Sequence, residues 1–127
     1  MKYLLDTHVA LWAFGDNEKL SEAAKHTILN PANEKFVSMA SAWELAIKIG
    51  TGKMEFDGGV SEFFRIIRKN GFGLLSITES HVKQVETLPL LHRDPFDRIL
   101  IASAMTEGMC LITADTNIHL YNVSSLW

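Results

Sequence analysis

Short apolar runs alternate along the chain with longer segments in which apolar residues recur at helical spacing. The apolar runs predict strands at 2–5 (KYLL), 35–38 (KFVS), 72–77 (FGLLSI) and 109–113 (MCLIT), and a last strand at 121–123 (YNV). The segments between them predict helices at 7–14, 21–30, 41–50, 60–71 and 78–88, and one that begins near residue 94. Because strands and helices alternate throughout, the pattern predicts a three-layer α/β/α fold around a mainly parallel sheet of four to five strands.

Polar residues at the predicted helix starts are typical of helix caps. Ser41 stands at the start of the third predicted helix and is its expected cap. In the stretch HRDPFDRILIASA at 92–104, Asp94 is the expected cap, and Pro95 suits the first helical position. Asp97 follows in the first turn, where free amide groups favour negative charge. Taken alone, the acids in this stretch need no functional explanation.

Four acidic residues nevertheless share a place relative to the predicted strands. They stand at or just beyond the expected carboxyl-terminal edge of the sheet, and they are Asp6, Glu44, Asp97 and Asp115. In parallel sheets this edge gathers the loops that lead from strands to helices, and ligands bind there. The sequence therefore predicts that the four acids converge.

Each acid also has a local structural explanation. Glu44 completes an S-x-x-E capping box with Ser41, and it precedes Lys48 by the four residues typical of a helical ion pair. The two later acids fit a helix cap and a turn. Asp6 is harder to explain in this way, because it interrupts an apolar run from strand to helix. A carboxylate buried there is costly unless it is paired or bound to a metal.

A divalent cation explains the convergence of four acids more directly than four separate caps and turns. Carboxylates held close together repel one another, which raises their pKa values or destabilises the fold unless a cation such as Mg²⁺ or Mn²⁺ neutralises them. Mg²⁺ prefers oxygen ligands and keeps several waters, so carboxylates and substrate phosphate oxygens suit it. Such a site favours hydrolysis of a phosphodiester bond, because the ion can activate water and stabilise the developing negative charge.

Composition limits the class of protein further. The 127 residues suffice for one compact domain, and we expect a single domain over 1–127. With 47% hydrophobic and 21% charged residues the chain is of globular type, no apolar run is long enough to span a membrane, and we expect no signal peptide. The lone Cys110 lies in an apolar run, which favours a reducing compartment such as the cytoplasm.

Other kinds of site are absent from the sequence. The net charge of -3 argues against a broad basic surface for nucleic acid, so any such substrate must be held locally. The five histidines lack zinc-site spacing, and we expect them in packing or surface roles. No glycine-rich phosphate loop and no G-x-S-x-G motif are present.

These residues together resemble the PIN-domain family, most of all the VapC-type toxin ribonucleases of bacterial and archaeal toxin–antitoxin pairs. The matching stretches occur in the family's order, at 4–12 (LLDTHVALW), 41–48 (SAWELAIK), 92–104 and 112–115 (ITAD). The four family acids then correspond to Asp6, Glu44, Asp97 and Asp115. The resemblance implies a PIN-like fold and a Mg²⁺- or Mn²⁺-dependent endoribonuclease that cuts single-stranded or loop regions of RNA.

The resemblance also implies supporting residues and partners. Thr7 and Thr113 are expected to support the acidic site, and Asn117 stands where many relatives have a further acid. Because asparagine adds no negative charge, the number of metal ions stays open. Candidate contacts to RNA phosphates are Lys48, Arg93 and Arg98. The resemblance further implies a homodimer and a cognate antitoxin whose C-terminal segment covers the acidic site.

Three alternative functions stay open at the level of sequence. The first is a metal-binding signalling domain of the phospho-receiver type, although the paired early acids and the late lysine of that class are absent. The second is a PIN domain that binds RNA without cutting it, against which the four intact acids argue. The third is a PIN-type nuclease that acts on DNA, because the contacts that recognise a 2′-hydroxyl cannot be located in the sequence.

Overall fold

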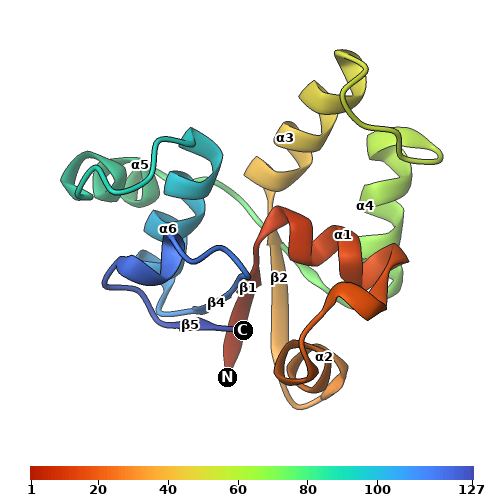
Figure 1. The fold of residues 1–127 in the computed structure, drawn as a ribbon, viewed down its shortest axis with the longest axis horizontal. Helices are drawn as coiled ribbons and strands as arrows, with labels where there is room; N and C mark the ends of the chain where they lie inside the picture. Colours follow the sequence, from red (N-terminus) through yellow and green to blue (C-terminus); the bar gives the residue numbers. More distant parts are fainter.

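The centre of the structure is a five-stranded sheet with helices on both sides (Figure 1). A computed structural model describes all residues 1–127. The strands are β1 (Lys2–Leu5), β2 (Glu34–Ser38), β3 (Gly73–Leu75), β4 (Cys110–Ile112) and β5 (Ser125–Leu126). All neighbouring strands pair in parallel, in the order β3-β2-β1-β4-β5. The predicted α/β/α fold with a parallel sheet is confirmed.

Helices cover the two faces of the sheet unequally. They are α1 (Thr7–Gly15), α2 (Glu22–Leu29), α3 (Met39–Gly50), α4 (Gly59–Lys69), α5 (Glu79–Thr87) and α6 (Pro95–Glu107), with short 3₁₀ helices η1 (Asn17–Lys19) and η2 (Ile118–Leu120). Leu5 packs into a core formed with helices α1 to α4, and its neighbour Leu4 packs into a second core with α6, η2 and the end of α5. Consecutive strand residues point to opposite faces, so the apolar pair buries both sides of the central strand.

The register of the central strands brings their carboxyl ends to one level. Leu5 of β1 lies opposite Val37 of β2 and Ile112 of β4. The residues that follow each strand, among them Asp6 and Thr113, therefore lie side by side at one edge of the sheet. This edge is where the sequence predicts the acidic site.

The start of α3 differs from the prediction. Ser38 caps the helix by accepting a hydrogen bond from the Ala40 amide at 3.0 Å, so the expectation that Ser41 is the cap is wrong. Strand β2 runs directly into α3, which leaves no loop in which a later serine could cap. Glu44 consequently lies beyond the first turn and forms no capping box with Ser41. The Ser41 hydroxyl is buried instead against the Thr7 hydroxyl, at 2.8 Å.

Strand β3 is shorter than predicted, and strand β5 lies later in the chain than predicted. Strand β3 keeps three residues, Gly73–Leu75, of the predicted 72–77. The final strand is β5 (Ser125–Leu126), so the predicted strand at 121–123 is wrong. Tyr121 follows η2, and its side chain packs into the second core. The apolar character of this position therefore reflects the core packing of a loop residue and not a strand.

Helix α6 begins as the sequence predicts. Asp94 caps it by accepting a hydrogen bond from the Phe96 amide at 2.8 Å, and Pro95 occupies the first helical position. Because α6 runs antiparallel to the strand that follows it, its first turn lies at the carboxyl edge of the sheet. The structure contains no helix with the length and apolar character that a membrane crossing requires.

Candidate active site

A pocket of about 360 Å³ lies at the carboxyl edge of the sheet. All four acids singled out in the sequence line it, together with Asp94, Lys48 and several uncharged or weakly basic side chains; the full lining is Asp6, His8, Val9, Trp12, Glu44, Lys48, Asp94, Asp97, Ala114 and Asp115. The four acids therefore converge on one pocket, as the sequence predicts. Negative side chains outnumber positive ones, so the pocket favours a cation.

Asp6 joins the central strand to α1 and lies at the floor of the pocket. Its backbone amide continues the strand pairing by donating to the Ile112 carbonyl at 3.0 Å. Its carboxylate caps α1, accepting from the His8 amide at 3.4 Å, and also accepts from the Thr113 hydroxyl at 2.7 Å. The first turn of α1 and the residue after β4 thus hold the carboxylate in one orientation.

Glu44 reaches the pocket from α3 and is nearly fully buried, with 4% of its surface exposed. One carboxylate oxygen, Oε2, accepts from the Lys48 ammonium at 2.8 Å, as the four-residue spacing predicts. The other oxygen, Oε1, is buried without a hydrogen-bond partner. A buried polar atom in this state is costly, and a cation in the pocket would satisfy it.

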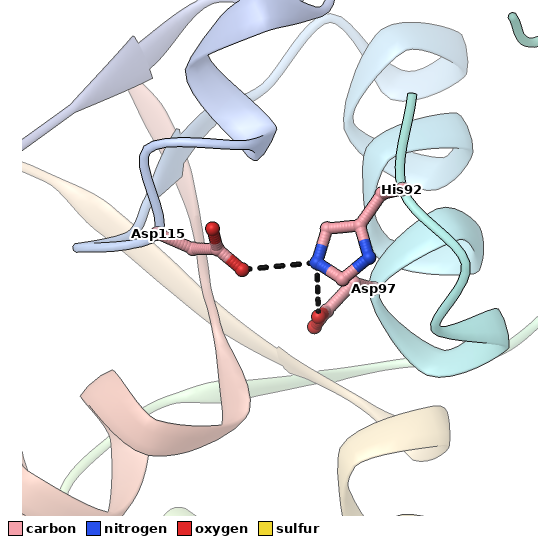
Figure 2. A group of neighbouring side chains, drawn as sticks. All are labelled: His92, Asp97 and Asp115. Carbon is pink, nitrogen blue, oxygen red and sulfur yellow. Dashed lines mark hydrogen bonds and ion pairs between the residues drawn. The ribbon is translucent and has the colours of Figure 1, made fainter. Parts of the chain in front are cut away.

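Asp97 and Asp115 meet across a histidine that the sequence reasoning missed. Figure 2 shows the His92 ring between the two carboxylates, with Nε2 hydrogen-bonded to Asp115 Oδ2 at 3.0 Å and 3.0 Å from Asp97 Oδ2. Potential ligand atoms of the three residues lie within 4.8 Å of one another. We expected the histidines in packing or surface roles. The available signal is position, because His92 is the first residue of the charged stretch HRDPFD at the start of α6.

Hydrogen bonds hold the loop that carries Asp115. Its carboxylate accepts from the Asn117 amide at 2.9 Å, and its own amide donates to the Thr113 hydroxyl at 3.1 Å. Thr113 is fully buried, and its hydroxyl links this loop to Asp6 by donating a hydrogen bond to the Asp6 carboxylate. Asn117 contributes its backbone amide, whereas its side chain is exposed and outside the pocket lining.

The pocket changes the pKa values of its carboxyl groups. Burial raises the pKa of Asp6 above its ordinary value. Burial, followed by repulsion from Asp6 and Asp94, raises the pKa of Asp97 from 3.8 to about 7. The pKa of Asp115 is lowered, because hydrogen bonds from His92 and from the Asn117 amide outweigh its burial. The cluster therefore resists full ionisation without a compensating cation.

The three basic residues expected at phosphate groups lie in different surroundings. Lys48 lines the acidic pocket, and its pKa is raised chiefly by the hydrogen bond to Glu44. Arg93 is exposed and lines a separate, more apolar pocket beside α5 and α6. Arg98 lines that second pocket too, and its guanidinium donates to the Pro89 carbonyl at 3.0 Å and the Tyr121 hydroxyl at 3.2 Å. These bonds engage Arg98 in holding a loop, which leaves the expectation of a phosphate contact there without support.

The donor set of the acidic pocket fits a hard divalent cation. Carboxylate oxygens from four separate segments face one space, and one of these oxygens is buried without any partner. Mg²⁺ and Mn²⁺ are bound in proteins mainly through such oxygens. Thr7, the remaining predicted supporting residue, lies behind the pocket, where its hydroxyl contacts Ser41.

Comparisons with known proteins agree on the family. The PIN domain family model matches residues 3–124. Ribonuclease VapC22 of Mycobacterium tuberculosis (strain ATCC 25618 / H37Rv) is 30% identical over 117 residues, which cover 91% of this chain and 88% of that protein. These matches extend over nearly all of the chain, and the four acids fall within the residues that the family model covers.

Solved structures share the fold at lower sequence identity. VapBC2 from Rickettsia felis, bound to a DNA fragment from its promoter, matches with a TM-score of 0.76 and 15% identity, covering 99% of this chain and 98% of that one. VapC20 of Mycobacterium tuberculosis, described as a toxin that cleaves the sarcin-ricin loop, matches with a TM-score of 0.64 and 14% identity over 93% of each chain. Sequence, fold and family model point the same way, and this chain belongs to the PIN-domain family.

Proposed function

We propose that this protein is a Mg²⁺- or Mn²⁺-dependent endoribonuclease and the toxin of a toxin–antitoxin pair. The observation that carries the proposal is the acidic pocket, in which Asp6, Glu44, Asp97 and Asp115 converge and one Glu44 oxygen is buried without a partner. The similarity to a protein named a ribonuclease supports RNA as the substrate. The similarity in fold to a toxin described as cleaving the sarcin-ricin loop agrees with it.

In this proposal the four acids hold the metal, and neighbouring residues hold the acids. A bound divalent ion supplies a polarised water and positive charge for the phosphodiester transition state. Thr113 fixes the orientation of Asp6 through their 2.7 Å hydrogen bond. Lys48 is partly exposed at the pocket and carries a positive charge at neutral pH, so it can contact a substrate phosphate. Arg98 is not included among the phosphate contacts of this proposal, because its guanidinium donates to the Pro89 carbonyl and the Tyr121 hydroxyl.

The direct test is cleavage of a mixed-sequence RNA and a matching single-stranded DNA by the purified protein. Each polymer is incubated with Mg²⁺, with Mn²⁺ or with EDTA, beside the variants Asp6→Asn and Asp97→Asn. We expect RNA cleavage that needs either metal and is lost in both variants, because each substitution removes a charged metal ligand. Asp57→Asn is the matched control, since Asp57 is exposed in the loop between α3 and α4.

Each contrary result has its own reading. Cleavage in EDTA would contradict metal dependence, and wild-type rates in Asp6→Asn or Asp97→Asn would remove that residue from the site. Preferential cutting of DNA would favour the alternative substrate. A folded protein that binds metal but cuts neither polymer would contradict the catalytic proposal and favour a domain that only binds RNA.

We extend the proposal to a cognate antitoxin and a homodimer. Structural neighbours include toxin–antitoxin complexes, such as the complex from Klebsiella pneumoniae, which has a TM-score of 0.64 and 17% identity. In this chain α3 exposes large apolar side chains at successive turns, Met39, Trp43 and Ile47. Trp43 also lines the apolar pocket next to the acidic site. An exposed apolar stripe of this kind is typical of a protein-binding surface.

Co-expression tests the partner. We expect that a short gene adjacent to the gene for this protein encodes the antitoxin. The antitoxin should co-purify with this protein and suppress its RNA cleavage. Trp43→Ser should weaken co-purification, whereas Leu120→Ser, at another exposed apolar residue, should not. Light scattering of the free protein is expected to give twice the mass of 14.2 kDa. A monomeric mass would contradict the proposed homodimer. Full RNA cleavage by the co-purified complex would contradict the proposal that the partner is an inhibiting antitoxin.

A further inference from the structure

His92 occupies the space between two of the proposed metal ligands. It stands in the loop before α6, and its ring lies between Asp97 of α6 and Asp115 of the loop after β4 (Figure 2). Nε2 is 3.0 Å from one oxygen of each carboxylate. Such an arrangement has two chemical readings, because an imidazole nitrogen can either ligate a metal beside the carboxylates or donate a hydrogen bond to them.

The second ring nitrogen decides between these readings. Nδ1 of His92 accepts a hydrogen bond from the backbone amide of Asp94 at 3.1 Å. A backbone amide can only donate, so Nδ1 presents a lone pair and the proton of the neutral ring is on Nε2. A histidine that ligates a metal through Nε2 instead donates its other N–H to an acceptor. With the Asp94 amide facing Nδ1, ligation would set two N–H groups against each other.

The loop that carries His92 is itself held from behind. The Tyr121 hydroxyl accepts from the backbone amides of His92 and Leu91, at 2.8 and 3.1 Å. Arg98 contacts the same hydroxyl and the Pro89 carbonyl. Tyr121 is nearly fully buried, with 4% of its surface exposed. The ring is thus fixed at its backbone and at both nitrogens, which is the rigidity expected of a group that orients others.

We propose that His92 is a positioning residue, which through an Nε2–H donor holds Asp115 and Asp97 in the relative orientation that metal binding requires. The inference rests on the proposed function, because it takes both acids as metal ligands. It assigns the nitrogen to the support of the carboxylates and excludes it from the metal's own ligands. Loss of a residue that hydrogen-bonds a ligand typically weakens metal affinity by about 10- to 100-fold.

The tautomer of His92 is measured first, on the metal-free protein labelled with ¹⁵N-histidine. Two-bond ¹H–¹⁵N spectra distinguish a proton on Nε2 from one on Nδ1, and His92 is assigned by comparison with His92→Gln. We expect the neutral Nε2–H form. A proton on Nδ1 would overturn the inference, since Nε2 would then be free to ligate. This measurement is made on the wild-type chain, so it does not depend on how a variant folds.

Metal affinity is measured next, by Mn²⁺ titration followed by electron paramagnetic resonance. We expect His92→Ala to bind Mn²⁺ about 10- to 100-fold more weakly than wild type. His92→Gln should recover part of this loss, because its amide can still donate to a carboxylate. His26→Ala is the control, since His26 is exposed on α2, far from the pocket lining. At saturating Mn²⁺ the RNA cleavage of His92→Ala should rise toward the wild-type rate.

The results separate this inference from the proposed function. Unchanged Mn²⁺ affinity in a folded His92→Ala variant would overturn the positioning role while wild type remains an active, metal-binding nuclease. Strong ¹⁴N coupling to bound Mn²⁺, lost in His92→Ala, would overturn it in favour of direct ligation. If the proposed function is wrong, the signature differs, because the wild-type protein itself then binds no Mn²⁺ and cuts no RNA.

Discussion

At the scale of single residues, the acids of the pocket differ in the support they receive. Asp115 accepts hydrogen bonds from His92 and from a backbone amide, which lower its pKa. Asp6 accepts from Thr113 and from the His8 amide, yet its burial raises its pKa. Burial and repulsion from neighbouring carboxylates raise the pKa of Asp97 to about 7. The metal-free pocket therefore disfavours a negative charge on Asp97.

This raised pKa predicts a pH-dependent stability of the metal-free protein. Folding raises the pKa of Asp97 from 3.8 to about 7, so the folded state keeps a proton that the unfolded state releases. Stability contributed in this way is present at low pH and is lost as the pH rises through that window, by up to ~4 kcal/mol. Asp97→Asn removes the titrating group. In EDTA, the variant should gain melting temperature over wild type at about pH 8 and little at about pH 5. An equal gain at both pH values would contradict the assignment.

Thr113 leads to a second prediction at this scale. Its buried hydroxyl donates to Asp6 and accepts from the Asp115 amide. Thr113→Val keeps the shape but leaves both groups without this partner, which should lower the free energy of unfolding by about 1–3 kcal/mol. Urea denaturation in EDTA measures the loss, and Thr116→Val, at an exposed position of the same loop, is the control. Equal stability of the two variants would show that the hydroxyl does not hold the loop.

At the scale of elements, the start of α3 positions Glu44. The helix begins immediately after β2, with Ser38 as its cap. Starting there, the helix carries Glu44 and Lys48 toward the pocket on one face, and Met39, Trp43 and Ile47 remain exposed. If the helix began at Ser41 instead, Glu44 would project in a different direction relative to the pocket.

The cap assignment is itself testable. Ser38→Ala should lower the free energy of unfolding by about 1 kcal/mol, because the Ala40 amide loses its acceptor. Ser41→Ala should act through a different contact, the hydroxyl pair with Thr7. Its effect should therefore be non-additive with Thr7→Val, whereas the effect of Ser38→Ala should add to that of Thr7→Val. Urea denaturation of the single and double variants decides, and coupling of Ser38 rather than Ser41 to Thr7 would contradict the structure.

At the scale of the whole molecule, the pocket joins parts of the chain that are far apart in sequence. Asp6 follows the first strand, and Thr113, its hydrogen-bond donor, lies 107 residues later. The pocket also takes one acid each from α3 and α6, which pack on opposite faces of the sheet. A ligand bound there connects both cores and is absent from the unfolded chain.

Metal binding should therefore stabilise the whole fold. Mn²⁺ at a hundredfold excess over its dissociation constant should add about 2.7 kcal/mol to the free energy of unfolding, which raises the melting temperature by several degrees. Thermal unfolding with and without Mn²⁺ measures the shift, with Asp57→Asn as the control. Glu44→Gln should lose most of the shift, because the buried oxygen without a partner belongs to this side chain. No shift in the wild-type protein would contradict a metal site.

Local sequence determined the elements and their approximate order. Apolar runs and helical spacing suffice for the α/β alternation, and a cap followed by proline suffices for the start of α6, because these signals depend on neighbours along the chain. They also predict that the acids gather at one edge, since parallel strands end together. The start of α3 escaped this reasoning because Ser38 and Ser41 are both good caps, and the absence of a loop after β2 decides between them.

Tertiary structure alone decided how the side chains meet. The contact of His92 with Asp115 joins segments separated in sequence, and no spacing rule brings a loop histidine to a carboxylate 23 residues away. Arg98 looked like a phosphate ligand beside the acids, but packing turns it toward Tyr121. The unpaired Glu44 oxygen likewise depends on what surrounds it. Hydrogen bonds and burial depend on distances between side chains in space. For residues far apart in sequence, these distances are defined only once the whole chain has folded.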